Sequence, residues 1–215
     1  RMYVYPPDGG PGFTPADEPS QARRGAGFLK LVMDEVAAHG KAYPIAEDLG
    51  VIPPFVRAAM EELKIPGYKV LRWEKRGDSF IDPPEYPFFS LAVPGTHDTS
   101  PLAVWYEDIS AGERWHLVSM LFRRDWDGPA PATLNGDILT GLLDSLLGAG
   151  SAMTLLPLQD VFGWKGQVNM PGTVGAHNWT WRMPATIVAL DTDPVLRSRG
   201  QILKDLVLRS GRAGR

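Results

Sequence analysis

The sequence predicts an α/β fold in which strands and helices alternate along the chain. Four short apolar runs are typical of buried strands, and they cover residues 42–46, 68–73, 88–93 and 152–158. Segments with apolar residues at helical spacing separate these runs. Because polar or acidic residues follow the runs, we interpret the chain as successive β/α units on a parallel sheet.

Six helical segments are expected from apolar periodicity and from residues that start or stop helices. The first runs from Ser20, which can cap it, to about His39, and Gly40 can end it. A second helix opens at the pair Pro53-Pro54 and reaches about Leu63. The others are expected at residues 101–106, at 111–122, around the apolar stripe Ile138, Leu139, Leu142, Leu143, Leu146 and Leu147, and at 194–209.

The order of these elements indicates one domain rather than several. Residues 1–19 are rich in proline and glycine and are expected to form a long loop, and residues 20–215 carry the β/α units. This alternation fits half of a (β/α)₈ TIM barrel, whose active sites lie at the C-terminal ends of the strands. A Rossmann-type sheet alternates in the same way, but no G-x-G-x-x-G or G-x-x-x-x-G-K-[ST] segment is present, so nucleotide binding is unsupported.

Charge and composition exclude several classes of function. The formal net charge of -3 leaves no positive surplus for nucleic acid or an acidic membrane surface. No run approaches the roughly 18 apolar residues that span a bilayer. The absence of cysteine excludes disulfides and favours a cytoplasmic location. No cluster of His, Asp or Glu has metal-ligand spacing, so neither a metal nor another cofactor is expected.

Two carboxylates follow predicted strands in different β/α units. Glu47 follows the run 42–46, and Asp98 follows the run 88–93. In a barrel both would reach one cavity at the top of the sheet. Glycosidic bond chemistry needs such a pair, because one acid protonates the leaving oxygen while negative charge stabilises an oxocarbenium-like transition state. From spacing alone, each acid could equally be a helix cap or a loop ion-pair partner.

Several segments, taken together, resemble the 4-alpha-glucanotransferases, also called amylomaltases or disproportionating enzymes. The segments are Ala-Glu-Asp-Leu-Gly-Val at 46–51, Pro-Gly-Tyr-Lys-Val-Leu at 66–71, Gly-Thr-His-Asp-Thr at 95–99, Leu-Pro-Leu-Gln-Asp at 156–160, Pro-Gly-Thr at 171–173 and Asn-Trp-Thr-Trp-Arg at 178–182. They occur in the family's order across about residues 20–210. The resemblance implies strands 5–8, approximately, of a (β/α)₈ barrel.

The resemblance also implies roles for individual residues. Glu47 corresponds to the general acid/base, and Asp98 to the residue that stabilises the transition state. Asp48, which directly follows Glu47, is expected to be structural. His97 would hydrogen-bond sugar hydroxyls. The other expected substrate contacts are Asn178, whose amide can donate and accept, Trp73, which could stack on a sugar or pack in the core, and Gln159, which could equally orient a loop.

The implied reaction is the retaining transfer of α-1,4-glucan segments between malto-oligosaccharides. In this family an aspartate in an Arg-x-Asp-His segment is the nucleophile, and residues 1–215 contain no such segment. We therefore expect the chain to be a fragment that is inactive alone, with the N-terminal half of the same barrel as a partner. Two alternatives are an α-amylase-type glycoside hydrolase and a non-catalytic carbohydrate-binding fragment.

Overall fold

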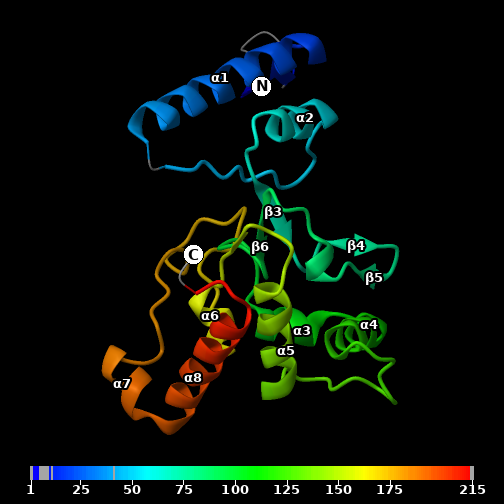
Figure 1. Ribbon diagram of the computed structural model, residues 1–215, viewed down its shortest axis with the longest axis vertical. Coiled ribbons are helices and arrows are strands. Elements are labelled where there is room, and N and C mark those ends of the chain that lie inside the picture. Colours follow the sequence, from blue (N-terminus) through cyan, green and yellow to red (C-terminus); the bar gives the residue numbers. More distant parts are fainter. Residues whose placement is uncertain (1, 5–9, 11, 41, 214–215) are drawn as a thin grey trace. The chain divides into compact units, whose positions relative to one another are not determined.

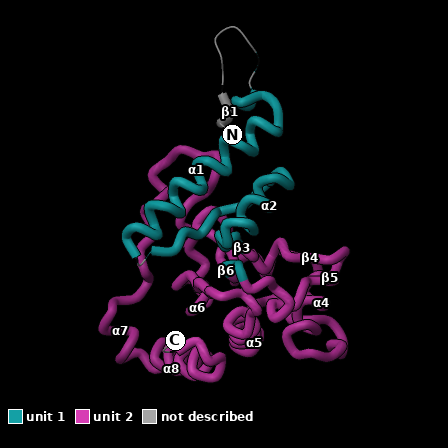
Figure 2. The backbone as a smooth tube through the Cα atoms, turned by 45° about the horizontal axis from the view of Figure 1, so that its top comes forward, with its two compact units in different colours: residues 1–68, 89–91 teal, residues 69–88, 92–215 magenta. Residues whose placement is uncertain are grey.

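The structure is a computed structural model that describes residues 2–4, 10, 12–40 and 42–213 (Figure 1). The chain divides into two compact units (Figure 2). Unit 1 comprises residues 1–68 and 89–91, and unit 2 comprises residues 69–88 and 92–215.

Unit 1 contains a hairpin and two helices. Strands β1 (Met2–Val4) and β2 (Gly12–Thr14) pair antiparallel within the stretch that was expected to be a loop. Helices α1 (Glu18–His39) and α2 (Pro54–Glu62) agree with the two predicted helices. Gly40 ends α1 in the left-handed conformation, as expected.

The N-terminal cap of α1 differs from the prediction. Asp17 is the capping residue, and its Oδ1 accepts a hydrogen bond from the Ser20 amide at 2.8 Å. Ser20 therefore lies in the first turn of the helix rather than before it. Both residue types favour the capping position, so the helix begins at the earlier of two suitable caps.

The predicted strand at residues 42–46 is reduced to one parallel bridge between Ala46 and Gly67. The Ala46 amide donates to the Pro66 carbonyl at 2.9 Å. Pro44 explains the difference, because a proline in the middle of the run has no N–H to donate to a ladder of hydrogen bonds. The segment still delivers Glu47 and Asp48 directly after its single bridge.

A three-stranded sheet has the order β3 (Gly67–Val70), β6 (Ser90–Val93), β7 (Met153–Thr154). Between β3 and β6 lie the antiparallel hairpin β4 (Lys75–Arg76) and β5 (Ser79–Phe80) and the short 3₁₀ helix η1 (Pro83–Glu85). Strand β7 is shorter than the predicted run 152–158, since Pro157 precedes helix α6 (Leu158–Phe162).

The remaining helices belong to unit 2. They are α3 (Leu102–Asp108), α4 (Ala111–Phe122), α5 (Gly136–Leu147), α7 (Ile187–Thr192) and α8 (Pro194–Arg209). The predictions for α3, α4, α5 and α8 are confirmed. The six residues of the α5 stripe are each at most 5% exposed, so this helix is central to the core. Its neighbours there include Leu71, Ala92, Leu102, Tyr106, Leu117 and Leu206.

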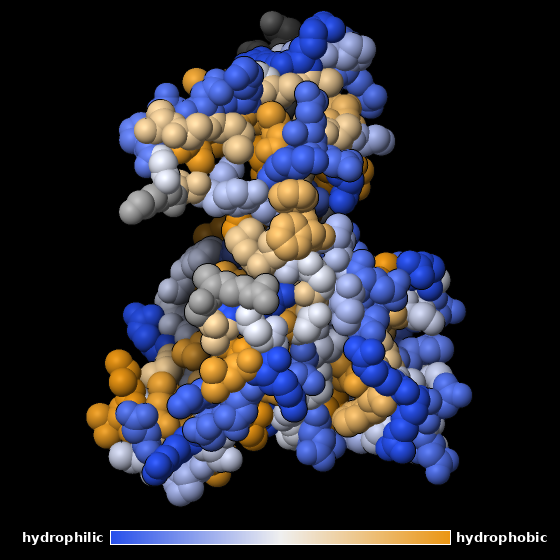
Figure 3. All heavy atoms as spheres, in the orientation of Figure 1, coloured by the Kyte–Doolittle hydropathy of each residue, from blue (hydrophilic) through white to orange (hydrophobic). Residues whose placement is uncertain are grey.

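Apolar residues also reach the molecular surface, as the orange atoms in Figure 3 show. On α1 they include Phe28, Leu31 and Val32, which are 47–59% exposed. Among the described residues, no helix combines the length and apolar character that crossing a membrane requires.

Candidate active site

Glu47 and Asp48 are adjacent in unit 1 but have different environments. Glu47 is exposed, whereas Asp48 is only 8% exposed. Asp48 accepts a hydrogen bond from the Tyr68 amide at 2.7 Å through Oδ1, and its Oδ2 lies 3.1 Å from Nη1 of Arg57. Asp48 therefore joins the segment after Ala46 to strand β3 and to helix α2. This arrangement leaves the carboxylate of Glu47 toward solvent.

The pKa of Tyr68 is sensitive to the charge of Glu47. Burial raises the pKa of Tyr68, and the negative charge of Glu47 raises it further. The second effect requires the Glu47 carboxylate to lie close enough to the phenol for their charges to interact.

In unit 2, the residues after β6 form a turn closed by two threonines. The Thr96 amide donates to Oγ1 of Thr99 at 2.9 Å, and this hydroxyl donates back to the Thr96 carbonyl at 2.9 Å. The amide of Asp98 donates to Oγ1 of Thr96 at 3.2 Å. The turn thus satisfies its own polar groups and fixes the backbone that carries His97 and Asp98.

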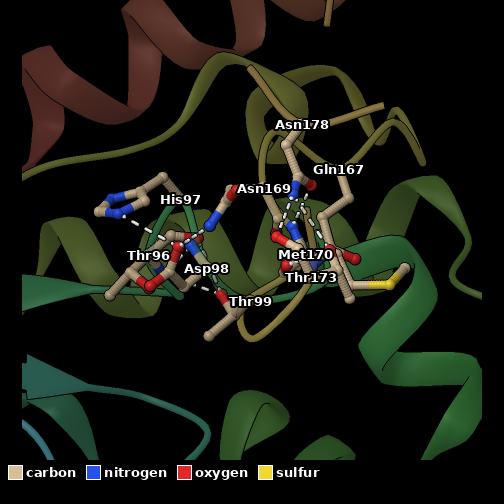
Figure 4. A network of polar contacts seen from close by, with 9 residues as sticks. All are labelled: Thr96, His97, Asp98, Thr99, Gln167, Asn169, Met170, Thr173 and Asn178. Atoms are coloured by element: carbon tan, nitrogen blue, oxygen red, sulfur yellow. Dashed lines mark hydrogen bonds and ion pairs between the residues drawn. The ribbon is translucent and has the colours of Figure 1, made fainter. Parts of the chain in front are cut away.

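The carboxylate of Asp98 is the centre of a polar cluster (Figure 4). Its Oδ1 accepts a hydrogen bond from Nδ2 of Asn169 at 2.7 Å and lies 3.2 Å from Nε2 of His97. The backbone N–H of Asn169 also donates to the His97 carbonyl at 3.2 Å. The side chains of His97 and Asp98 are 46% and 42% exposed, so both remain accessible to a ligand.

The loop that carries Asn169 is held by Asn178. Oδ1 of Asn178 accepts from the Met170 amide at 2.9 Å, and its Nδ2 donates to the carbonyl and to Oγ1 of Thr173, both at 3.0 Å. Trp179 follows with φ of 61°, and its ring lies 5.1 Å from the His97 ring. Both the oxygen and the nitrogen of the Asn178 side-chain amide are therefore hydrogen-bonded to the loop.

The other two expected substrate contacts lie on different elements. Trp73 is 51% exposed in the turn after β3. Gln159 is 9% exposed and lies in helix α6, not at the end of a strand as the sequence suggested. The structure thus joins His97, Asp98 and Asn178 through the loop 167–178, and Glu47 belongs to unit 1.

Three residues of this region were not among the site residues predicted from the sequence. Asn169 lies two residues before the Pro-Gly-Thr segment at 171–173, and this proximity to a family segment was the available signal. Arg72 and Asp160 are 7% and 2% exposed. Burial lowers the pKa of Arg72 to about 10 and raises the pKa of Asp160 to about 6, while the attraction between the two charges opposes both shifts.

A hydrogen-bonded carboxylate beside an imidazole and amides can bind hydroxyl groups and stabilise positive charge. The residues that the structure describes contain no group of three or more His, Cys, Asp or Glu side chains arranged to hold a metal ion.

A family model and several known proteins match most of this chain. A family model described as 4-alpha-glucanotransferase matches residues 15–187. A 4-alpha-glucanotransferase of Synechocystis sp. is 33% identical over 144 residues, which are 64% of this chain and 26% of that protein. A 4-alpha-glucanotransferase of Chlamydia muridarum is 26% identical over 92% of this chain and 38% of that protein. The chain therefore spans about a quarter to two fifths of the length of these relatives.

Two solved structures have a similar fold. The amylomaltase from Streptococcus agalactiae in complex with acarbose matches 82% of this chain and 33% of its own, with a TM-score of 0.65 and 23% identity. The amylomaltase from Corynebacterium glutamicum matches 75% of this chain and 29% of its own, with a TM-score of 0.54 and 23% identity. The mixed α/β architecture described above is thus similar to part of the fold of these two amylomaltases.

Proposed function

The chain belongs to the 4-alpha-glucanotransferase family, and we propose that it forms part of an enzyme that transfers α-1,4-glucan segments between malto-oligosaccharides. In this proposal, residues 1–215 contribute about strands 5–8 to one (β/α)₈ catalytic barrel. The substrates are α-1,4-glucans, and the enzyme acts in the cytoplasm.

The observation that carries the proposal is the environment of Asp98. Its carboxylate follows strand β6, is 42% exposed, and has one oxygen hydrogen-bonded to Asn169 and adjacent to His97. Cleavage of a glycosidic bond develops positive charge on the anomeric carbon and the ring oxygen. We assign to Asp98 the stabilisation of this charge, and to His97 the binding of sugar hydroxyls on the same ring.

Glu47 is proposed as the general acid/base. Its side chain is exposed, whereas the adjacent Asp48 is engaged with Tyr68 and Arg57. Only Glu47 of this pair is therefore available to give a proton to the leaving oxygen and later to remove one from the acceptor hydroxyl. Trp73, Asn178 and Gln159 remain proposed substrate contacts.

A retaining mechanism also needs a carboxylate nucleophile that forms a covalent glycosyl-enzyme. Residues 1–215 contain no Arg-x-Asp-His segment. We propose that this carboxylate comes from an N-terminal half of the same barrel. Attack by its oxygen on the anomeric carbon breaks the glycosidic bond, and a sugar hydroxyl then displaces the carboxylate.

The products formed from maltotriose test the proposed reaction. A protein containing this chain is expected to give both shorter and longer oligosaccharides, separated by chromatography. Products that are only shorter would indicate a hydrolase. Binding without conversion, even after addition of the N-terminal half, would indicate a carbohydrate-binding protein instead.

A further inference from the structure

Arg72 connects the two ends of the loop that carries His97 and Asp98. Nε of Arg72 donates to the Pro94 carbonyl at 3.1 Å, at the point where β6 ends. Nη2 donates to the carbonyl of Ser100 at 2.8 Å, and Nη1 donates to the Ser100 hydroxyl at 3.4 Å. A single planar guanidinium therefore spans the loop 94–100 from its first residue to its last.

The position of Arg72 is fixed from several sides. The residue follows Leu71, whose amide donates to the Val93 carbonyl at 2.9 Å, so the backbone of Arg72 is adjacent to the end of β6. The guanidinium carbon lies 5.3 Å from the centre of the Trp105 ring, which provides a cation-π contact. The charge of Asp160 acts on the same guanidinium, and Oδ1 of Asp160 accepts from the Leu102 amide at 2.6 Å.

The loop also leaves room for this contact. A Cβ atom at position 95 would lie 2.7 Å from Nη2 of Arg72, so Gly95 allows the guanidinium to approach the backbone. Burial of a charged group is costly unless its donors have partners. A position that needed only packing would favour an uncharged side chain over an arginine. Arg72 instead donates hydrogen bonds to carbonyls at both ends of one loop.

We propose that Arg72 is a positioning residue: it holds both ends of the loop 94–100 and thereby sets the orientation of Asp98 and His97 toward the sugar. The proposal rests on the proposed function for the role of Asp98, but the contact between Arg72 and the loop does not. Lysine cannot replace it fully, because one ammonium group lacks the planar fork that reaches Pro94 and Ser100 together.

Amide hydrogen exchange measured by NMR on the 215-residue chain tests the contact itself. In Arg72→Lys, the amides of Thr96, Asp98 and Thr99 are expected to exchange about tenfold faster or more, because hydrogen bonds from a charged donor are lost. The amides of helix α5 should keep their rates. Unchanged exchange in the loop would overturn the proposal.

A matched control uses another arginine of unit 2 that donates to two carbonyls. Arg114 donates to the carbonyls of Glu107 and Ile109, at the end of α3. Arg114→Lys is expected to leave exchange at Thr96, Asp98 and Thr99 unchanged. Equal acceleration of these amides in Arg114→Lys and Arg72→Lys would mean that the loop responds to any lost arginine, and the proposal would fail.

If Arg72→Lys also accelerates exchange in α5, the double variant Arg72→Gln/Asp160→Asn decides. It removes both buried charges together, so neither is left without its partner. Faster exchange confined to the loop supports the proposal, and exchange that matches the wild type contradicts it.

Steady-state kinetics distinguish a positioning role of Arg72 from a purely structural one. In a protein that converts maltotriose, Arg72→Lys is expected to lower kcat about tenfold or more and to change KM little, because the misplaced Asp98 stabilises the transition state less. A loosened loop with unchanged kcat would overturn the proposal. A wild-type protein without transfer activity would refute the proposed function, and the exchange experiment would still decide the contact.

Discussion

The buried carboxyl group of Asp160 makes the stability of the fold depend on pH. Its side chain is 2% exposed, and burial raises its pKa from 3.8 to about 6 despite the hydrogen bond from Leu102 and the charge of Arg72. The folded chain therefore holds this proton at higher pH than the unfolded chain does. Stability contributed by this group is present at low pH and is lost as the pH rises from about 4 to about 6.

Replacing this carboxyl should remove that part of the pH dependence. Asp160→Asn keeps an oxygen that can accept from the Leu102 amide but has no charge to bury. Relative to the wild type, the free energy of unfolding of Asp160→Asn is expected to rise by about 2 kcal/mol between pH 4.5 and pH 7. Urea unfolding of both proteins at the two pH values measures this difference. A difference that stays constant with pH would show that the carboxyl does not titrate in this window.

The electrostatic effect of Glu47 on Tyr68 allows a second prediction at the level of single residues. Because the charge of Glu47 contributes to the raised pKa of Tyr68, Glu47→Gln should lower that pKa toward its ordinary value. An NMR titration of the Tyr68 ring signals measures the change. Glu61 is exposed. The control variant Glu61→Gln should leave the Tyr68 pKa unchanged.

The residues of the proposed site could be predicted only where a segment of sequence marked them. Glu47, His97 and Asp98 follow apolar runs and lie in recognisable segments. Asn169 and Arg72 contribute hydrogen bonds to residues 71 and 28 positions away in the chain. Periodicity and spacing report local structure, so contacts of such sequence separation are not visible in them.

At the scale of elements, the helices were easier to predict than the strands. The stripe of α5 and the limits of α4 and α8 follow from 3.6-residue periodicity, which extends over several turns. The strands are only two to four residues long. An apolar run that contains a proline, such as 42–46 or 152–158, keeps its composition but cannot form a full ladder.

The junction between the segment 46–48 and strand β3 depends on a glycine. A Cβ atom at Gly67 would lie 2.5 Å from Oδ1 of Asp48, which also binds the Tyr68 amide. Gly67→Ala is therefore expected to displace the Asp48 carboxylate and to lower the free energy of unfolding by about 1–3 kcal/mol in urea.

The matched control for this substitution lies in helix α1. A Cβ atom at Gly27 would have no atom within 4 Å. Gly27→Ala is expected to be neutral or to stabilise the protein by about 0.5–1 kcal/mol, since alanine favours the helix. Equal effects at Gly67 and Gly27 would contradict the role assigned to the contact with Asp48.

For the whole molecule, the proposed reaction assigns different tasks to residues of the two units. Glu47 belongs to unit 1, and Asp98, His97 and Asn169 belong to unit 2. A proton donor acts on the leaving oxygen, whereas a charge-stabilising carboxylate acts on the sugar ring. The two roles therefore respond differently to the chemistry of the leaving group, and this difference can be measured.

The most direct measurement compares maltotriose with α-maltosyl fluoride as donors, in a protein that contains this chain and converts maltotriose. Fluoride leaves without a proton, so Glu47→Ala should lose about 10²–10⁴-fold in rate with maltotriose but retain much of its rate of fluoride release in the first turnover, before an acceptor hydroxyl has to be deprotonated. Asp98→Asn should be impaired with both donors, because both pass through a positively charged sugar. If Glu47→Ala were impaired equally with both donors, or Asp98→Asn with neither, the assignment of these two acids would be contradicted.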